Sequence, residues 1–290
     1  MMLAWYYLVI ISSLISVLVS IIQKRTLKIE HATQYSAASS FLLAIVALIF
    51  IPFANFNITP LQLAYTVMFG VFAAITLLLG VRVIKHAHLS ATTPISNALP
   101  LFFIVVFAYA FLSEKLTAIQ YFSVAGIIIT TYLMLFRKKQ NQPDHDYESS
   151  KYKYLLVISA MISAGGSIIG KYLLVHINVF TFMIISQIVV AACLAIFATI
   201  RYGGLGEIAS TVRRYRGTFF TIVSLILILR VIYYFALTTA PISIASTLNN
   251  AVFVLVTVPI GGVVFKEDDI VRKTLMSAII TVFAYLLIQQ

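Results

Sequence analysis

The chain has 290 residues, of which 61% are hydrophobic and only 10% are charged, and its formal net charge is +11. A soluble domain of this length could not hide so much apolar surface from water, so the composition excludes a soluble enzyme and predicts a membrane protein. The one cysteine, Cys193, lies in an apolar run, which excludes a disulfide framework and a cysteine-ligated metal site.

Ten apolar runs occupy almost the whole chain. A helix needs about 20 largely apolar residues to cross a bilayer. Runs of that kind lie at residues 3–22, 34–53, 61–82, 90–112, 118–136, 153–172, 177–200, 217–238, 242–265 and 271–288. We therefore predict an all-α integral membrane protein with ten transmembrane helices. Basic residues follow the first run rather than precede it, so that run is expected to be an uncleaved anchor.

The longest polar stretch falls halfway along the chain. It predicts a first five-helix unit over residues 1–137, a polar linker over 138–152 and a second five-helix unit over 153–290. The acidic residues Asp144, Asp146 and Glu148 in the linker lack a regular metal-ligand spacing and indicate a solvated segment. The pair His86 and His88 is expected at an interface, so no metal site and no cofactor are predicted.

Two internal matches relate the halves. Serines recur every four residues and end on a lysine in both the first and the sixth run: Ser12, Ser16, Ser20 and Lys24, then Ser159, Ser163, Ser167 and Lys171. A second match pairs the fourth run with the ninth: Ser90, Thr93, Asn97 and Glu114 with Ser243, Ser246, Asn250 and Glu267. The chain is therefore predicted to contain a duplicated unit.

Because each unit has five spans, an odd number, the second copy must be inverted in the membrane. The loops after odd-numbered spans carry most of the Lys and Arg residues, so the two units place their basic loops at opposite repeat positions. The positive-inside rule then puts these loops in the cytoplasm and both termini outside an inner or plasma membrane. Inverted repeats are typical of alternating-access transporters, whose substrate site lies near the midplane between the halves.

The strings HAHLSATTPISNALPLFFIVVFAYAFLSEKLT and YYFALTTAPISIASTLNNAVFVLVTVPIGGVVFKE carry a family resemblance. With these strings and its two predicted five-helix units, the chain resembles the EamA-like permeases of the drug/metabolite transporter superfamily. The resemblance covers essentially the whole chain and implies a central cavity built largely by spans 3, 4, 8 and 9. Two features depart from the family: Phe253 stands opposite Pro100, and family members are often drawn with cytoplasmic termini.

Arg230 is the most informative side chain because it lies well inside the eighth apolar run. An Arg at the bilayer centre is unfavourable by roughly 2.5–3.5 kcal/mol on insertion scales, and all nine carboxylates lie in loops or at helix ends. Tyr233 and Tyr234 follow one turn later on its face. This arrangement suits a carboxylate or phosphate on a small substrate. The alternative is an Arg that reaches an interface or binds helix-end carbonyls.

Other polar residues are weaker candidates. Asn97, Asn249, Asn250 and Ser243 form polar stripes that bind either substrate or a partner helix. Lys24 and Lys171 either line a cavity mouth or act as interfacial anchors, and the serine stripes favour helix packing. Glu114 and Glu267 close short turns, which favours a structural role.

The sequence thus predicts a secondary transporter, not an enzyme, for a small anionic or zwitterionic metabolite such as an amino acid or a nucleotide-like compound. Its expected partners are the substrate and the lipid bilayer, with proton coupling left open, no nucleic acid and a monomeric state. One alternative is a proton-coupled exporter of cationic drugs or metabolites, which would have to use Glu114 or Glu267 as its acid. The other is a non-transporting membrane scaffold.

Overall fold

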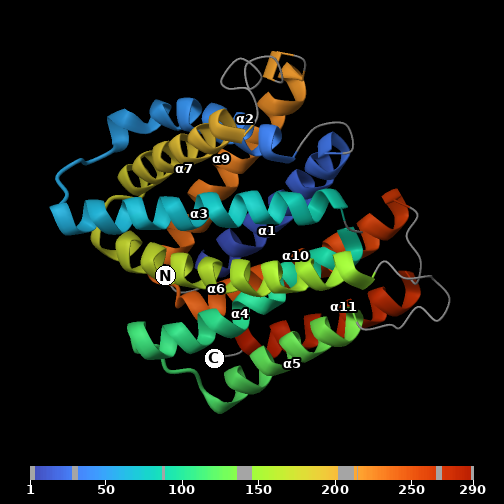
Figure 1. Cartoon of the computed structure of the whole chain (residues 1–290). Coiled ribbons are helices and arrows are strands. Elements are labelled where there is room, and N and C mark those ends of the chain that lie inside the picture. The colour runs from blue at the N-terminus through green and yellow to red at the C-terminus, as the bar shows by residue number, and fades with distance from the viewer. Residues whose placement is uncertain are drawn as a thin grey trace.

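The computed structural model describes residues 4–27, 32–86, 89–135, 146–201, 212–213, 215–265 and 270–288. In these ranges the chain forms ten long α-helices and one 3₁₀-helix (Figure 1). They are α1 (Ala4–Leu27), α2 (Ala32–Ala47), η1 (Leu48–Phe53), α3 (Pro60–His86), α4 (Leu89–Leu112), α5 (Ala118–Leu135), α6 (Asp146–His176), α7 (Val179–Arg201), α9 (Arg216–Thr239), α10 (Ile242–Phe265) and α11 (Ile270–Ile288).

Each of the ten predicted spans corresponds to one of these helices, which confirms the expected all-α membrane fold. Seven of the described helices are long and apolar enough to cross a bilayer, and three further described apolar stretches are shorter. The second span differs in its last turns, where the α-helix ends at Ala47 and η1 continues to Phe53. Pro52 lies inside η1 and has no N–H to donate to a helical hydrogen bond, which disfavours a regular α-helix there.

The start of α6 also differs from the sequence-based prediction. The helix begins at Asp146, so the last part of the expected 138–152 linker is helical, whereas residues 136–145 lie outside the described ranges. The boundaries of the two predicted five-helix units therefore stay a prediction.

Helices of each half of the chain pack against helices of the other half. In the first half α1 packs against α9 and α10, and in the second half α6 packs against α3 and α4. Three further pairs join helices in equivalent positions of the two halves: α2 with α7, α4 with α10, and α5 with α11. The pairing of α5 with α11 is visible in Figure 1. This reciprocal pattern is what a duplicated unit would produce, and it makes most of the core an interface between the halves.

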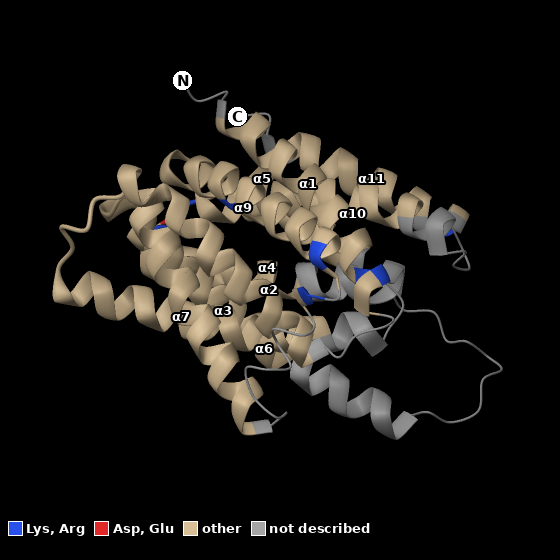
Figure 2. Cartoon of the chain, turned by 90° about the horizontal axis from the view of Figure 1, so that it is seen from above, with Lys and Arg blue, Asp and Glu red and all other residues tan. Residues whose placement is uncertain are grey.

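The outer surface of the bundle is strongly apolar. Large side chains such as Ile200, Phe220 and Phe111 are among its most exposed residues. Figure 2 shows Lys and Arg on only short segments of the described helices, most of them together on one side of the view. Lys24 and Arg25 lie in the last turn of α1. An apolar surface of this extent suits contact with lipid rather than with water.

The serine stripes of α1 and α6 bond to their own helices. Ser16 and Ser20 each donate to the carbonyl oxygen four residues earlier, at 2.9 Å, and Ser167 does the same to Ser163. These hydroxyls therefore need no outside partner, and their small size lets neighbouring helices approach closely. This pattern supports the packing role that the sequence favoured for them.

Gly70 marks one close approach between α3 and α7. A Cβ atom added there would lie 2.7 Å from both Cβ and Cγ1 of Val189 and 3.1 Å from the carbonyl oxygen of Ser186. In contrast, a Cβ atom added to Gly80, on the same helix, would meet nothing within 4 Å.

We therefore predict that Gly70→Ala lowers the melting temperature of the detergent-purified protein, because overpacking at a rigid contact costs about 1–3 kcal/mol. Gly80→Ala is the matched control and should leave the melting temperature unchanged or raise it slightly, since Ala favours the helix. Equal melting temperatures for the two variants would contradict the close packing of α3 on α7.

Candidate substrate-binding site

Several polar side chains lie at one depth inside the helix bundle. Arg230 is nine residues before the end of α9, Gln187 is eight residues after the start of α7, and Asn250 is eight residues after the start of α10. Ser13 is nine residues after the start of α1. At a rise of about 1.5 Å per residue, all four are about 12–14 Å from those helix ends. Half of a hydrocarbon core is about 15 Å thick, so they form a polar layer near the membrane midplane.

The centre of this layer is a contact between Arg230 and Gln187. Arg230 is half-buried, and its Nη1 donates a hydrogen bond to Oε1 of Gln187. Gln187 is only 1% exposed, and its Nε2 donates to the carbonyl oxygen of Ser40 on α2 at 3.3 Å. Both ends of the Gln187 amide are thus used, and the side chain presents a fixed acceptor to the guanidinium.

Gln187 was not among the residues predicted from the sequence. It is the one amide side chain within the seventh apolar run, residues 177–200, apart from Asn178 at its start. A buried amide in the middle of an apolar helix has to hydrogen-bond, because lipid offers no partner. That argument would have identified Gln187 as a candidate, although not its pairing with Arg230.

The described residues offer Arg230 no carboxylate. Glu114 is the one acidic residue whose side chain lies in the described part of the chain, and its oxygens bind the start of α10. In the described structure the guanidinium charge is therefore stabilised by the dipole of a neutral amide. The predicted lack of an acidic partner for Arg230 along the whole chain stays a prediction.

Tyr233 and Tyr234 face different neighbours. The Tyr233 hydroxyl lies 3.2 Å from Oγ of Ser246 on α10. The Tyr234 ring packs edge-on against Phe182 of α7, with ring centroids 5.2 Å apart. Tyr233 thus ties α9 to α10, one helical turn beyond Arg230, whereas Tyr234 belongs to the packed core. Their predicted role in a pocket around Arg230 stays a prediction.

The asparagines of α10 also differ from each other. Oδ1 of Asn249 accepts a hydrogen bond from Ser13 at 2.6 Å, which joins α10 to α1. Asn250 is 3% exposed, and neither Oδ1 nor Nδ2 has a hydrogen-bond partner in the described structure. Asn97 lies in α4, but its side chain is outside the described residues. A buried amide without partners is costly, so Asn250 is the described side chain most in need of a polar ligand.

Lys171 and Glu114 lie away from this layer, on either side of the turn between α9 and α10. Nζ of Lys171 donates to the carbonyl oxygens of Leu237 at 2.6 Å and Ala240 at 2.7 Å, at the end of α9. Oε1 of Glu114 accepts from the backbone N–H of Ile242 at 2.8 Å. Each charge is placed where the helix dipole favours it, the cation at a C-terminus and the anion at an N-terminus.

Ser243 belongs to the same turn. Its backbone N–H and its hydroxyl both donate to Oε2 of Glu114. Ser113 lies between Glu114 and the end of α4 at Leu112, and it has a φ of 55°. The Glu114 N–H then returns to the carbonyl oxygen of Ala108 at 3.2 Å. We name the contacts of Lys171 and Glu114 around this turn the turn clamp.

The turn clamp bears on the candidate residues at the helix ends. Glu114 already accepts three hydrogen bonds, which does not favour it as the acid of a cation exporter, and Glu267 lies outside the described residues. Lys171 and Ser243 have structural partners at the helix ends rather than in the polar layer. Lys24 is half-buried in the last turn of α1. Substrate contacts for these residues stay predictions.

We predict that Glu114→Ala lowers the stability of the purified protein by about 2–4 kcal/mol, because three donors at the start of α10 lose a charged acceptor. Chemical unfolding in detergent measures this change. Lys115→Ala is the control, since Lys115 is the exposed neighbour of Glu114. A loss of similar size in both variants would contradict the turn clamp.

Comparison with known proteins agrees with this architecture. Residues 3–136 match the EamA-like transporter family. Among solved structures 27 chains match, and one crystal structure of a protein has a TM-score of 0.66 and 13% sequence identity, covering 98% of this chain and 96% of that chain. At this identity the likeness shows the fold alone. No curated protein matches the sequence. The chain is therefore a multi-pass membrane protein that carries an EamA-like transporter domain of the drug/metabolite transporter superfamily over residues 3–136, in a family of non-enzymatic secondary transporters.

Proposed function

We propose that this transporter moves a small anionic or zwitterionic metabolite, such as an amino acid or a nucleotide-like compound, and that Arg230 binds its carboxylate or phosphate. One observation carries the proposal. Arg230 lies near the membrane midplane, and its partner among the described residues is the neutral amide of Gln187.

The physical argument starts from the energy of the guanidinium. Placing Arg at the centre of a transmembrane helix costs roughly 2.5–3.5 kcal/mol on insertion scales. A guanidinium has five N–H donors, and the contact with Gln187 involves one nitrogen, Nη1. The remaining donors suit the two oxygens of a carboxylate or phosphate, which would also neutralise the charge. Binding of an anionic substrate would therefore offset the free-energy cost of placing the guanidinium inside the membrane.

The rest of the polar layer supports a substrate with a second polar group. Asn250 offers one acceptor and two donors at the same depth as Arg230, and none of them is used in the described structure. The Tyr233 hydroxyl bridges from α9 to Ser246, one turn from Asn250. An ammonium, hydroxyl or amide group next to the anion would be matched by these side chains, which is why the proposal includes zwitterions.

The contacts between the halves support alternating access. Glu114 belongs to the first half and holds the start of α10 in the second half. Ser13 and Asn249 join the halves at the polar layer. In the proposed cycle the Glu114 contact separates when a path opens from the α9–α10 end of the bundle to Arg230. In an inverted-repeat transporter such a contact forms in one access state and breaks in the other.

We predict that Arg230→Gln abolishes uptake of an anionic substrate into proteoliposomes, because the only described cation of the polar layer is lost. Arg216→Gln is the matched control, since it makes the same chemical change at the first residue of the same helix, outside the polar layer. The melting temperatures of both variants should stay close to that of the wild type. Normal uptake by Arg230→Gln would overturn the proposal.

A second variant tests the charge balance without removing Arg230. Gln187→Glu places a carboxylate where the amide oxygen now lies, so it should neutralise Arg230 internally and compete with an anionic substrate. We expect at least a tenfold loss of apparent affinity in a thermal-shift titration, with folding retained.

The double variant Gln187→Glu/Arg230→Gln separates this effect from simple damage. It buries a carboxylate with no guanidinium, so its melting temperature should fall well below those of both single variants. Undiminished substrate affinity in the single Gln187→Glu variant would show that Arg230 does not bind the anion.

A further inference from the structure

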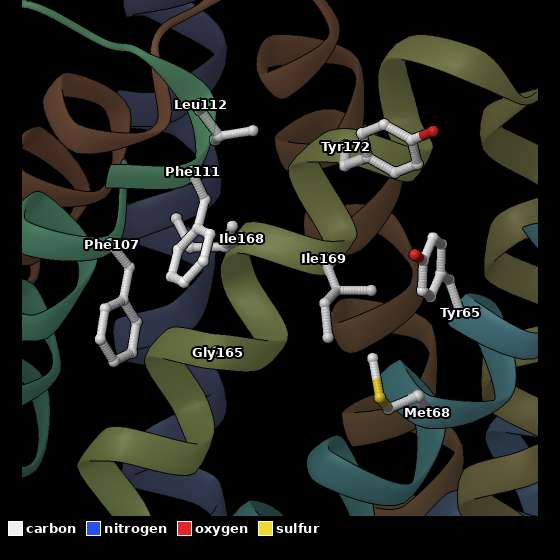
Figure 3. Close-up of a pocket in the computed structure, with 9 residues that line it drawn as sticks. All are labelled: Tyr65, Met68, Phe107, Phe111, Leu112, Gly165, Ile168, Ile169 and Tyr172. Atoms are coloured by element: carbon white, nitrogen blue, oxygen red, sulfur yellow. The ribbon is translucent and has the colours of Figure 1, made fainter. Parts of the chain in front are cut away.

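A cavity lies on the side of α6 that faces between α3 and α4, and none of the polar-layer residues lines it. It has a volume of about 530 Å³ and is lined by side chains of all three helices (Figure 3). We name it the α6 groove. Its floor is one face of α6, from Gly165 through Ile168 and Ile169 to Tyr172, at the spacing of one helical stripe.

The groove follows from how the three helices pack. The α6 helix contacts both α3 and α4 along its length, whereas α3 and α4 make few contacts with each other. The two helices therefore separate over α6 and leave its face uncovered. Phe111, on the α4 wall, is 73% exposed, so the groove is open on the outer surface of the bundle.

The depth of the groove matches one leaflet of a bilayer. Tyr65 is five residues after the start of α3 and Tyr172 is four residues before the end of α6, which places both about 6–8 Å below those ends. Gly165 is eleven residues before the end of α6, or about 16 Å. The groove thus runs from near the membrane interface to about the midplane.

The chemistry of the lining changes along this path. Most lining side chains are apolar, such as Phe107, Ile168 and Met68. The exceptions are the phenols Tyr65 and Tyr172 at the interfacial end, whose rings meet edge-on with centroids 5.9 Å apart. Neither hydroxyl has a hydrogen-bond partner in the described part of the chain. A matching ligand is apolar over most of its length and carries hydrogen-bond acceptors at one end.

We propose that the α6 groove binds one acyl chain of a bilayer lipid, and that the hydroxyls of Tyr65 and Tyr172 donate to the ester or phosphate oxygens of that lipid. The groove opens onto the apolar surface of the spans, so a lipid enters it sideways without crossing water. An apolar cavity of this size gains little from water and much from hydrocarbon. The site is independent of Arg230 and of the transported substrate.

Native mass spectrometry of the full chain with added dioleoylphosphatidylcholine tests this site. Met68→Trp extends a large side chain into the groove, and Val67→Trp is the matched control on the next residue of α3. The two positions are 37% and 39% exposed, but Val67 does not line the groove. We expect Met68→Trp to retain one lipid fewer per chain than the wild type and Val67→Trp to retain the same number.

Two further variants keep the test decisive if Met68→Trp folds poorly. Gly165→Leu fills the floor, and its Cβ would meet only the Phe72 ring, at an ordinary 3.5 Å. The double variant Tyr65→Phe/Tyr172→Phe keeps the groove but removes its donors, so lipid affinity should fall about threefold to tenfold. Unchanged lipid retention in the folded groove-filling variants, or equal retention of a single-chain detergent and the lipid, would overturn the proposal. Neither result would affect the Arg230 site.

Discussion

A guanidinium in the middle of a bilayer must be solvated by the protein itself, and the contact of Arg230 with Gln187 meets that need. It draws on three helices, because α9 carries the cation, α7 carries the amide and α2 supplies the carbonyl of Ser40 that holds the amide. An amide stabilises the charge without neutralising it. Among the described residues the site therefore keeps a positive charge near the midplane, and the proposed preference for anions rests on that charge.

The turn clamp and the polar layer hold the helices of the second half together at two different depths. At the helix ends, Lys171 and Glu114 match the dipoles of α9 and α10 and fix the turn between them. Deeper in the bundle, Tyr233 and Ser246 keep the same two helices in register. Asn250 has no hydrogen-bond partner in the described structure, so its amide is free to bind a polar group at the proposed substrate site. Because Glu114 comes from the first half, the clamp also joins the two halves of the chain.

Much of the fold could be predicted because a helix that crosses a lipid bilayer needs a largely apolar run of about 20 residues. Each apolar run of about 20 residues became one helix, and Arg230 could be singled out because a charge inside such a run is rare. Two boundaries differ from the prediction: α2 ends at Ala47 and gives way to η1, which contains Pro52, and α6 begins earlier than its apolar run. The partners could not be predicted in the same way. Gln187 is 43 residues from Arg230, and Glu114 is 128 residues from Ile242, so these contacts depend on tertiary packing that periodicity does not encode.

The most direct test of the account is a thermal-shift measurement on the purified wild-type protein with matched pairs of metabolites that differ only in one charge. Each pair consists of a carboxylate or phosphate and its neutral amide or ester. A ligand that binds only the folded protein raises the melting temperature by mass action. The account predicts that at least one anionic member stabilises the protein and that its neutral counterpart does not. Stabilisation by cationic metabolites alone, or equal stabilisation by the charged and neutral members of every pair, would contradict the assignment of Arg230 as the anion-binding group.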